Sequence, residues 1–246
     1  MIRVTDLRFG FPGQRQIFDG LSLDVPTGTV TALLGPSGSG KSTVLRLVAG
    51  LLTPAAGAVE RPDAAPGRAA MSLVFQDPRL LPWLTVEGNA ALALEASGVP
   101  RGEWPDRIQP LLARVGLGAA GNLRPASLSG GMAQRAALVR GLALRPRALL
   151  LDEPFAAVDP LLREDLQGAL QDLLAGADTT TLLVTHDIAE ALCLADRVVV
   201  LVGRPARVSA CIAVNLPRPR NVETRLSPAF AALAREVRAA LEGPRA

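Results

Sequence analysis

The stretch Gly35-Pro36-Ser37-Gly38-Ser39-Gly40-Lys41-Ser42 decides the fold of this 246-residue chain. It follows an apolar run, Val30–Leu34, which is typical of a fully buried strand. After it, Ser42–Ala49 has the apolar spacing of a helix, and Gly50 supplies a C-cap. The order strand, glycine loop, helix predicts a loop whose successive backbone N–H groups enclose phosphates.

Lys41 and Ser42 are the chemically distinctive residues of this loop. In a phosphate-binding loop of this pattern the lysine reaches the β- and γ-phosphates and the serine holds Mg²⁺. Among 26 lysines and arginines Lys41 is the single lysine, and His186 is the single histidine. Because the chain otherwise uses arginine for every cation, we predict that both positions are functional. The alternatives are a fortuitous glycine turn at the loop and a structural role for the histidine.

Composition limits the class of protein. The net charge is +3, tyrosine is absent and aromatic residues make up 3%, which argues against a nucleic-acid partner. No apolar run approaches the roughly 18 residues of a membrane helix, and the segment Met1–Asp6 lacks the apolar core of a signal peptide. We therefore expect the chain to stay in the cytoplasm. Cys193 and Cys211 lack metal-binding spacing, and their apolar neighbours predict buried thiols.

Strands and helices alternate along most of the chain. Leu21–Val25 reads as a half-buried strand. Further buried strands are expected at Met71–Phe75, Ala148–Leu151, Thr181–Val184 and Arg197–Val202, and helices near Leu161–Leu174 and Ile188–Ala195. This alternation predicts an α/β fold with a mainly parallel sheet.

Two other segments interrupt this alternation. Between Asp77 and Arg145 helix-like segments are broken by Gly and Pro, which predicts a helical insertion. Beyond the Pro/Arg-rich segment Pro217–Arg220, Ser227-Pro228 opens a short helix. One face of that helix is apolar and is expected to pack on the body of the protein; it carries Phe230, Leu233, Val237 and Leu241.

Charged and polar side chains follow two of the expected strands. Asp152 and Glu153 end the strand that begins at Ala148, and His186 follows the strand Thr181–Val184. Ligands bind at the carboxyl edge of such sheets, so these groups are expected to lie close to a γ-phosphate. Asp152 suits Mg²⁺, and Glu153 suits a general base that orients and activates a water. The alternative for the two acids is a solvated strand end before the turn at Pro154.

Leu128-Ser129-Gly130-Gly131-Met132 precedes a helical stretch, Ala133–Leu144. A serine, a flexible glycine pair and the positive end of a helix dipole together predict a second anion site. An ordinary glycine turn that caps a helix is the alternative.

Together, in this order, the motifs resemble the ATP-binding subunits of ABC transporters over nearly the whole chain. The resemblance implies a P-loop NTPase fold of the ABC type, with a mainly parallel core sheet, an N-terminal antiparallel β part and a helical subdomain. It divides a single ABC ATPase domain, residues 1–246, into a RecA-like core of about 1–76 and 146–215, a helical subdomain of about 77–145, and a tail with a helix at 216–246.

The resemblance also assigns roles to residues, with ATP and Mg²⁺ as cofactors. It identifies as the ATP-binding Walker A segment Gly35, Pro36, Ser37, Gly38, Ser39, Gly40, Lys41, Ser42 and Thr43. Gln76 becomes the Q-loop glutamine, a catalytic residue. Mg²⁺ is held by Gln76, Ser42 and Asp152. Glu153 becomes the catalytic base, and His186, also catalytic, becomes the switch histidine. Phe11 aligns with the aromatic residue that stacks on adenine, although a core phenylalanine is the alternative.

The remaining motifs imply a second copy of the chain. The signature residues, expected to close over the nucleotide of the other copy in a head-to-tail homodimer, are Leu128, Ser129, Gly130, Gly131, Met132 and Gln134. Asp159 becomes the D-loop aspartate, in a segment that reads Ala156-Ala157-Val158-Asp159 where the family more often has Ser or Gly first and Leu third.

Three segments are similar to the nitrate/sulfonate/taurine importer group: Val74–Val86, Leu128–Arg135 and Leu216–Arg220. The resemblance implies two integral-membrane permease subunits and a solute-binding protein as partners, and a peripheral position at the cytoplasmic face of the inner membrane. The solute is then a small oxyanion such as nitrate, an aliphatic sulfonate or taurine. The alternatives are a pyrimidine or thiamine precursor as solute, or a soluble ABC ATPase that acts on nucleic acid or ribosomes.

Overall fold

The structure, a computed structural model, describes residues 1–156, 158–175 and 177–242. Within these ranges six strands form one sheet in the order β5-β6-β7-β3-β8-β9. Their bounds are Met71–Val74 (β5), Ala148–Asp152 (β6), Thr180–Val184 (β7), Val30–Leu34 (β3), Arg197–Val202 (β8) and Arg207–Ala213 (β9). The first five strands run parallel, and β9 pairs antiparallel with β8. The predicted mainly parallel sheet is therefore confirmed.

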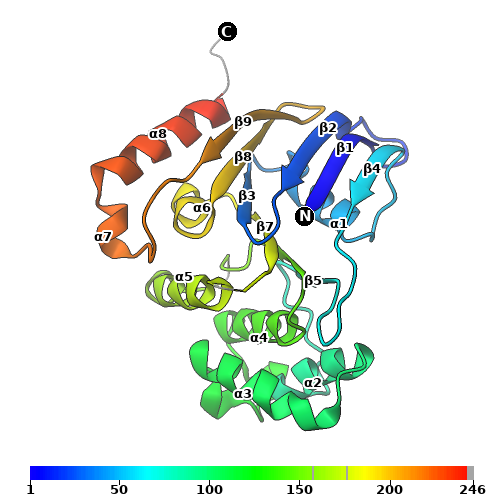
Figure 1. Cartoon of the computed structure of the whole chain (residues 1–246), viewed down its shortest axis with the longest axis vertical. Coiled ribbons are helices and arrows are strands. Elements are labelled where there is room, and N and C mark those ends of the chain that lie inside the picture. Colours follow the sequence, from blue (N-terminus) through cyan, green and yellow to red (C-terminus); the bar gives the residue numbers. More distant parts are fainter. Residues whose placement is uncertain (157, 176, 243–246) are drawn as a thin grey trace.

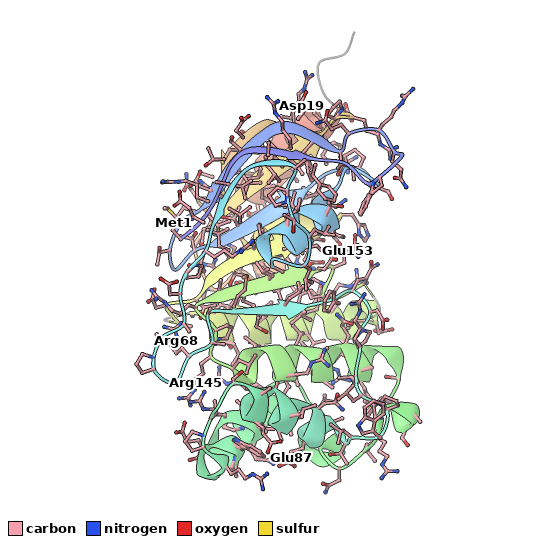
Figure 2. All side chains as sticks on the ribbon, turned by 90° about the vertical axis from the view of Figure 1, so that its right-hand side faces the viewer. Met1, Asp19, Arg68, Glu87, Arg145 and Glu153 are labelled. Carbon is pink, nitrogen blue, oxygen red and sulfur yellow. The ribbon has the colours of Figure 1, made fainter. Side chains whose placement is uncertain are left out.

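Because five strands are parallel, their carboxyl ends meet at one edge of the sheet. In Figure 2, Glu153 lies at this edge, whereas Arg68 and Arg145 lie at the opposite edge. Strands β3, β6 and β7 are buried at every residue, since helices cover both faces of the sheet. The long apolar runs in the sequence thus become the centre of the fold.

A second sheet lies at the N-terminus. In the described ranges it contains three antiparallel strands in the order β2-β1-β4, with bounds Phe18–Val25, Ile2–Phe9 and Ala56–Glu60. Strands β1 and β2 alternate between buried and exposed residues, as expected for a sheet with one face on the core. Their inner face packs against helix α1 (Lys41–Val48). The N-terminal antiparallel part of the expected fold is confirmed.

Helices fill the chain between β5 and β6, and Figure 1 shows them gathered at the end of the molecule away from the N-terminal sheet. The α-helices are α2 (Val86–Ala96), α3 (Trp104–Arg114) and α4 (Gly130–Ala143), and short 3₁₀ turns occupy Arg101–Glu103 (η1), Gly118–Ala120 (η2) and Pro125–Ser127 (η3). All described residues from 77 to 145 lie outside strands, as the broken helical pattern predicted.

In the described part of the chain four helices follow β6: α5 (Pro160–Leu174), α6 (Ile188–Leu194), α7 (Val222–Arg225) and α8 (Pro228–Glu242). Helix α8 lies against α6 and β8, with Phe230 and Val237 buried, so the predicted apolar face does pack on the body. The Pro/Arg-rich segment before α7 is fixed by Arg220, whose buried guanidinium donates to the carbonyls of Leu192, Ala195 and Val214. Within the described ranges no helix has the length and apolar character needed to cross a membrane.

The expectation of two buried thiols is half wrong. Cys193 is buried on α6, but Cys211 is exposed on β9. Strand β9 is at the sheet edge and its side chains alternate, so Ile212 points to the core and Cys211 points away from it. The apolar neighbours of Cys211 in the sequence did not reveal which face of the strand it occupies.

Candidate nucleotide-binding and catalytic site

The phosphate-binding loop lies between the buried end of β3 and the first turn of α1. Gly40 is the N-cap of α1 with φ 90°, and Gly38 has φ 74°. A Cβ atom at Gly40 would lie 2.7 Å from both Ile17 Cγ2 and Phe18 Cζ, and one at Gly35 would lie 2.6 Å from a backbone carbonyl oxygen. The glycines therefore allow the loop to pack closely on the body of the protein, in backbone conformations that other residues rarely adopt.

Lys41 bends back over this loop. Its Nζ donates to the carbonyl oxygens of Gly35 at 2.8 Å and Pro36 at 3.1 Å. Burial lowers the pKa of Lys41, and the nearby carboxylates of Glu153 and Asp152 oppose that shift. The ammonium group is thus held at the loop, between backbone dipoles and two acids.

Ser42 and Asp152 come together from positions 110 residues apart. The Ser42 hydroxyl donates to Asp152 Oδ1 at 2.8 Å. Desolvation raises the pKa of Asp152, and the Ser42 hydrogen bond opposes that rise. A hydroxyl and a carboxylate that converge in this way are hard oxygen donors, which Mg²⁺ prefers. The donor set therefore fits the predicted metal.

Glu153 occupies a strained position directly after β6. Its φ of 46° is in the left-handed region, and its backbone N–H donates to Val184 O at 2.9 Å on the neighbouring strand. The carboxylate Oε2 lies 3.2 Å from His186 Nδ1 and accepts from Gln76 Nε2 at 3.4 Å. Gln76, Glu153 and His186, from the ends of three adjacent strands, thus meet at the Glu153 carboxylate. The sequence predicted that Glu153 and His186 lie at the same edge of the sheet.

An open cavity of about 630 Å³ joins these groups. It is lined by Ile17, Ser37, Gly38, Gly40, Lys41, Ser42, Thr43, Gln76, Glu153 and His186. The Lys41 ammonium group and the backbone of the loop share this lining with the Glu153 carboxylate, which suits a polyphosphate and an attacking water. Ile17 is the member that the sequence did not single out, because it stands outside every motif.

Phe11 is not among the residues that line this cavity. It is partly buried and packs edge-on against Phe9, with ring centroids 5.1 Å apart and an interplanar angle of 83°. Its predicted stacking on adenine stays a prediction.

The signature residues also lie outside this cavity. Ser129 is exposed and caps α4, since its hydroxyl accepts from Met132 N at 3.3 Å, and Gly130 beside it is exposed. Leu128 and Met132 are partly buried against the core.

The buried position of Gln134 contradicts the expectation that this residue contacts the nucleotide of a second copy. Its side chain is buried and donates to Phe75 O at 3.2 Å. It shares a face of α4 with Gly141, where a Cβ would come within 2.8 Å of Val74 on β5. Gln134 therefore faces β5 and ties α4 to the residue before Gln76.

Asp159 is exposed just before α5 and is likewise absent from the cavity lining. Its carbonyl oxygen accepts from Arg163 N at 2.8 Å in the first turn of that helix. Ala156 is exposed and Val158 is buried, whereas the Ala157 of the same motif lies outside the described residues.

Comparison with known proteins identifies the family. The model of the family described as ABC transporter matches residues 18–156, more than half of the chain. The chain belongs to the ABC transporter family. It is an ATPase of that family and binds ATP with Mg²⁺, as the motifs had predicted.

Curated relatives cover most of the chain. It is 48% identical over 217 residues, 85% of each chain, to an aliphatic sulfonates import ATP-binding protein, SsuB 1, of Pseudomonas aeruginosa strain UCBPP-PA14. It is 46% identical to an SsuB 2 of Pseudomonas syringae pv. tomato, which covers 87% of this chain and 88% of that one. A putative ATP-binding protein of Brucella abortus biovar 1 is 41% identical, over 89% of this chain and 85% of that one.

Solved structures agree with the fold. A dimeric, post-hydrolysis ATP-binding cassette, MJ0796, bound to ADP and Pi is 27% identical with a TM-score of 0.77, covering 87% of this chain and 99% of that chain. An ATP-binding subunit of an ABC transporter is 28% identical with a TM-score of 0.77, covering 97% and 100%. The ABC-type ATPase fold predicted from the sequence is confirmed.

Proposed function

We propose that the loop from Gly35 to Thr43 holds the triphosphate of ATP and that Glu153 activates the water that attacks it. The observation that carries this proposal is the meeting of Lys41, Glu153 and His186 on one cavity. Glu153 accepts a proton from the water, and His186, 3.2 Å away, orients its carboxylate and faces the γ-phosphate. Gln76 donates to the same carboxylate and keeps it in place.

Ser42, Asp152 and Gln76 form the proposed Mg²⁺ site. The hydrogen bond between Ser42 and Asp152 supports this assignment, because it holds two oxygen donors together beside the phosphate-binding loop. Mg²⁺ bound there would neutralise negative charge on the β- and γ-phosphates. These three side chains fix the position at which that charge is neutralised.

The working unit proposed for this ATPase is a head-to-tail homodimer. The ATP cavity lacks the signature residues of its own chain, and Ser129 and Gly130 are exposed at the start of α4. A second copy would bring them to the open side of the nucleotide, where the dipole of α4 favours a phosphate. Asp159 would lie at the same interface. The dimeric state of the MJ0796 cassette supports this arrangement.

The proposed process is uptake of a small solute, an aliphatic sulfonate or a related oxyanion such as taurine or nitrate. Relatives at 46 to 48% identity are named for aliphatic sulfonate import, and this supports the assignment. Two permease subunits and a solute-binding protein would complete the transporter, with the ATPase bound peripherally at the cytoplasmic face of the cell membrane. The chain itself does not contact the solute. Its cavity binds the ATP that drives transport, and the partner proteins select the solute.

The test is uptake by membrane vesicles that contain the chain with permease subunits of a sulfonate importer, ATP inside and the matching binding protein outside. We expect ATP-driven uptake of an aliphatic sulfonate, absent with Glu153→Gln. Taurine, nitrate and a thiamine precursor are offered in parallel, and preferred uptake of the precursor would replace the proposed solute class. Copurification with nucleic acid and never with a membrane protein would overturn the transport assignment itself.

A further inference from the structure

Arg163 joins two segments at the edge of the catalytic site. It lies in the first turn of α5, and its Nη2 donates to Val158 O at 3.1 Å, in the loop that ends at Asp159. Its Nη1 lies 3.9 Å from Oδ2 of Asp187, the residue after His186. A single guanidinium thus spans the loop before α5 and the start of α6, although these segments are far apart in the sequence.

The segment that carries His186 is held on its other sides by its own hydrogen bonds. Asp187 caps α6, since Oδ1 accepts from Ala189 N at 2.7 Å and from Glu190 N at 3.2 Å. The backbone N–H of Asp187 donates to Thr185 Oγ1 at 3.0 Å. One carboxylate oxygen of Asp187 therefore sets the helix, and the other faces Arg163.

Arg163 is partly buried beside two acidic residues, Asp187 and Glu190. Its side chain is 30% exposed, and its Nε is buried without a hydrogen-bond partner in the described part of the chain. Glu190, four residues after His186, is 5% exposed, and its Oε1 is also buried without a hydrogen-bond partner in the described part of the chain. The guanidinium therefore lies 3.9 Å from the partly exposed Asp187 carboxylate, with the buried Glu190 carboxyl nearby.

We propose that Arg163 is a positioning residue for ATP hydrolysis, which fixes the loop ending at Asp159 to the segment that carries His186. Without it, Asp187 and Val158 O lose their common partner, and the two segments are free to move relative to each other. His186 would then sample positions away from Glu153 Oε2, whereas the phosphate-binding loop, on a different strand, would be unchanged. The inference rests on the catalytic roles proposed for Glu153 and His186.

A positioning role for Arg163 affects kcat and not the binding of ATP, and steady-state kinetics can separate the two. Arg163 does not line the ATP cavity, so its loss should lower kcat and leave the KM for ATP and the affinity for ATP unchanged. A displacement of a catalytic group by about 1 Å can cost on the order of 100-fold in rate, so we expect Arg163→Ala to lower kcat by about 10- to 100-fold. Arg163→Lys keeps the charge and should recover part of the loss.

Arg68 offers a matched control. Its side chain is 28% exposed, and its guanidinium donates to the carbonyls of Arg145, Pro146 and Asp178 at the opposite edge of the sheet. Figure 2 shows Arg68 far from Glu153. Arg68→Ala removes more hydrogen bonds than Arg163→Ala does, but away from the catalytic site, so it should lower the melting temperature and leave kcat close to that of the wild type.

Asp187→Asn completes the experiment. Asparagine caps a helix as well as aspartate does, so this variant removes the charge and keeps α6. If Arg163 acts through Asp187, the variant with both substitutions should be no slower than Arg163→Ala alone. The proposal would be overturned if the kcat losses of Arg163→Ala and Asp187→Asn multiply in the double variant. It would also be overturned by a kcat of Arg163→Ala within about twofold of wild type, or by equal kcat losses in Arg163→Ala and Arg68→Ala.

The assays use the purified full-length chain with ATP and Mg²⁺, with Glu153→Gln as reference. Hydrolysis by the wild type that Glu153→Gln abolishes supports the proposed catalytic base independently of Arg163. If Glu153→Gln hydrolyses ATP at the wild-type rate, the roles of Glu153 and His186 fail, and the positioning role of Arg163 fails with them.

Discussion

Glu190→Gln should make the stability of this protein less dependent on pH. Glu190 is buried on α6, and desolvation, aided by the charge of Asp187, raises its pKa from an ordinary value of 4.5 to about 8. A hydrogen bond with Thr185 and the charge of Arg163 oppose the rise, and Glu153 adds to it. At neutral pH the folded protein therefore holds a proton on this carboxyl that the unfolded chain has released.

The sign and size of the effect follow from proton linkage. Between pH 4.5 and 8 the folded state binds more protons at this site than the unfolded state, so the free energy of unfolding falls as the pH rises. Each unit of pKa shift corresponds to about 1.4 kcal/mol, which gives an upper limit of about 5 kcal/mol for the whole shift. Glutamine resembles the neutral acid and cannot ionise. We therefore expect similar stabilities at pH 5 and a more stable variant, by about 2 to 5 kcal/mol, at pH 8.5.

Urea unfolding of the nucleotide-free protein at a series of pH values measures this difference. Glu236→Gln, an exposed glutamate on α8, is the control and should give a curve parallel to that of the wild type. A Glu190→Gln variant that stays parallel to the wild type from pH 5 to 8.5, or that is the less stable of the two at pH 8.5, would refute the reasoning.

Three further substitutions test the phosphate-binding loop. Gly40→Ala places a Cβ 2.7 Å from two neighbouring side chains at φ 90°, and should lower the free energy of unfolding by at least about 1–3 kcal/mol and lower the melting temperature. Gly98→Ala, at φ 70° with no atom within 4 Å of the added Cβ, is the control and should lower it less. Equal losses of stability in the two variants would contradict the packing argument. Lys41→Met removes the ammonium group and should weaken ATP binding about 10- to 100-fold in a fluorescence titration, whereas unchanged affinity would exclude it from the phosphate site. Ser42→Ala should reduce the gain in ATP affinity caused by Mg²⁺ and leave binding in EDTA unchanged; equal losses in both conditions would remove Ser42 from the metal site.

Much of the fold and site could be predicted because the signals are contiguous in the sequence. A buried parallel strand is an apolar run, and a phosphate-binding loop is a run of glycines between a strand and a helix, so β3, the loop and α1 were predicted with nearly their observed bounds. Glu153 and His186 were predicted to meet because parallel strands bring their carboxyl ends to one edge. Strand β9 was missed, since Arg207–Ala213 is a mostly exposed edge strand and lacks the long apolar run that marks the buried strands.

Other features depend on which face of an element packs against its neighbour, and a local pattern does not encode that. The sequence alone determined an ABC-type ATPase and predicted that Lys41, Asp152, Glu153 and His186 form its site. Only the tertiary structure turned Gln134 inward toward β5 and Cys211 outward, and brought Arg163 to Asp187. The physical reason is that a buried hydrogen bond or ion pair depends on the distance between atoms of separate elements, which packing of the whole core sets.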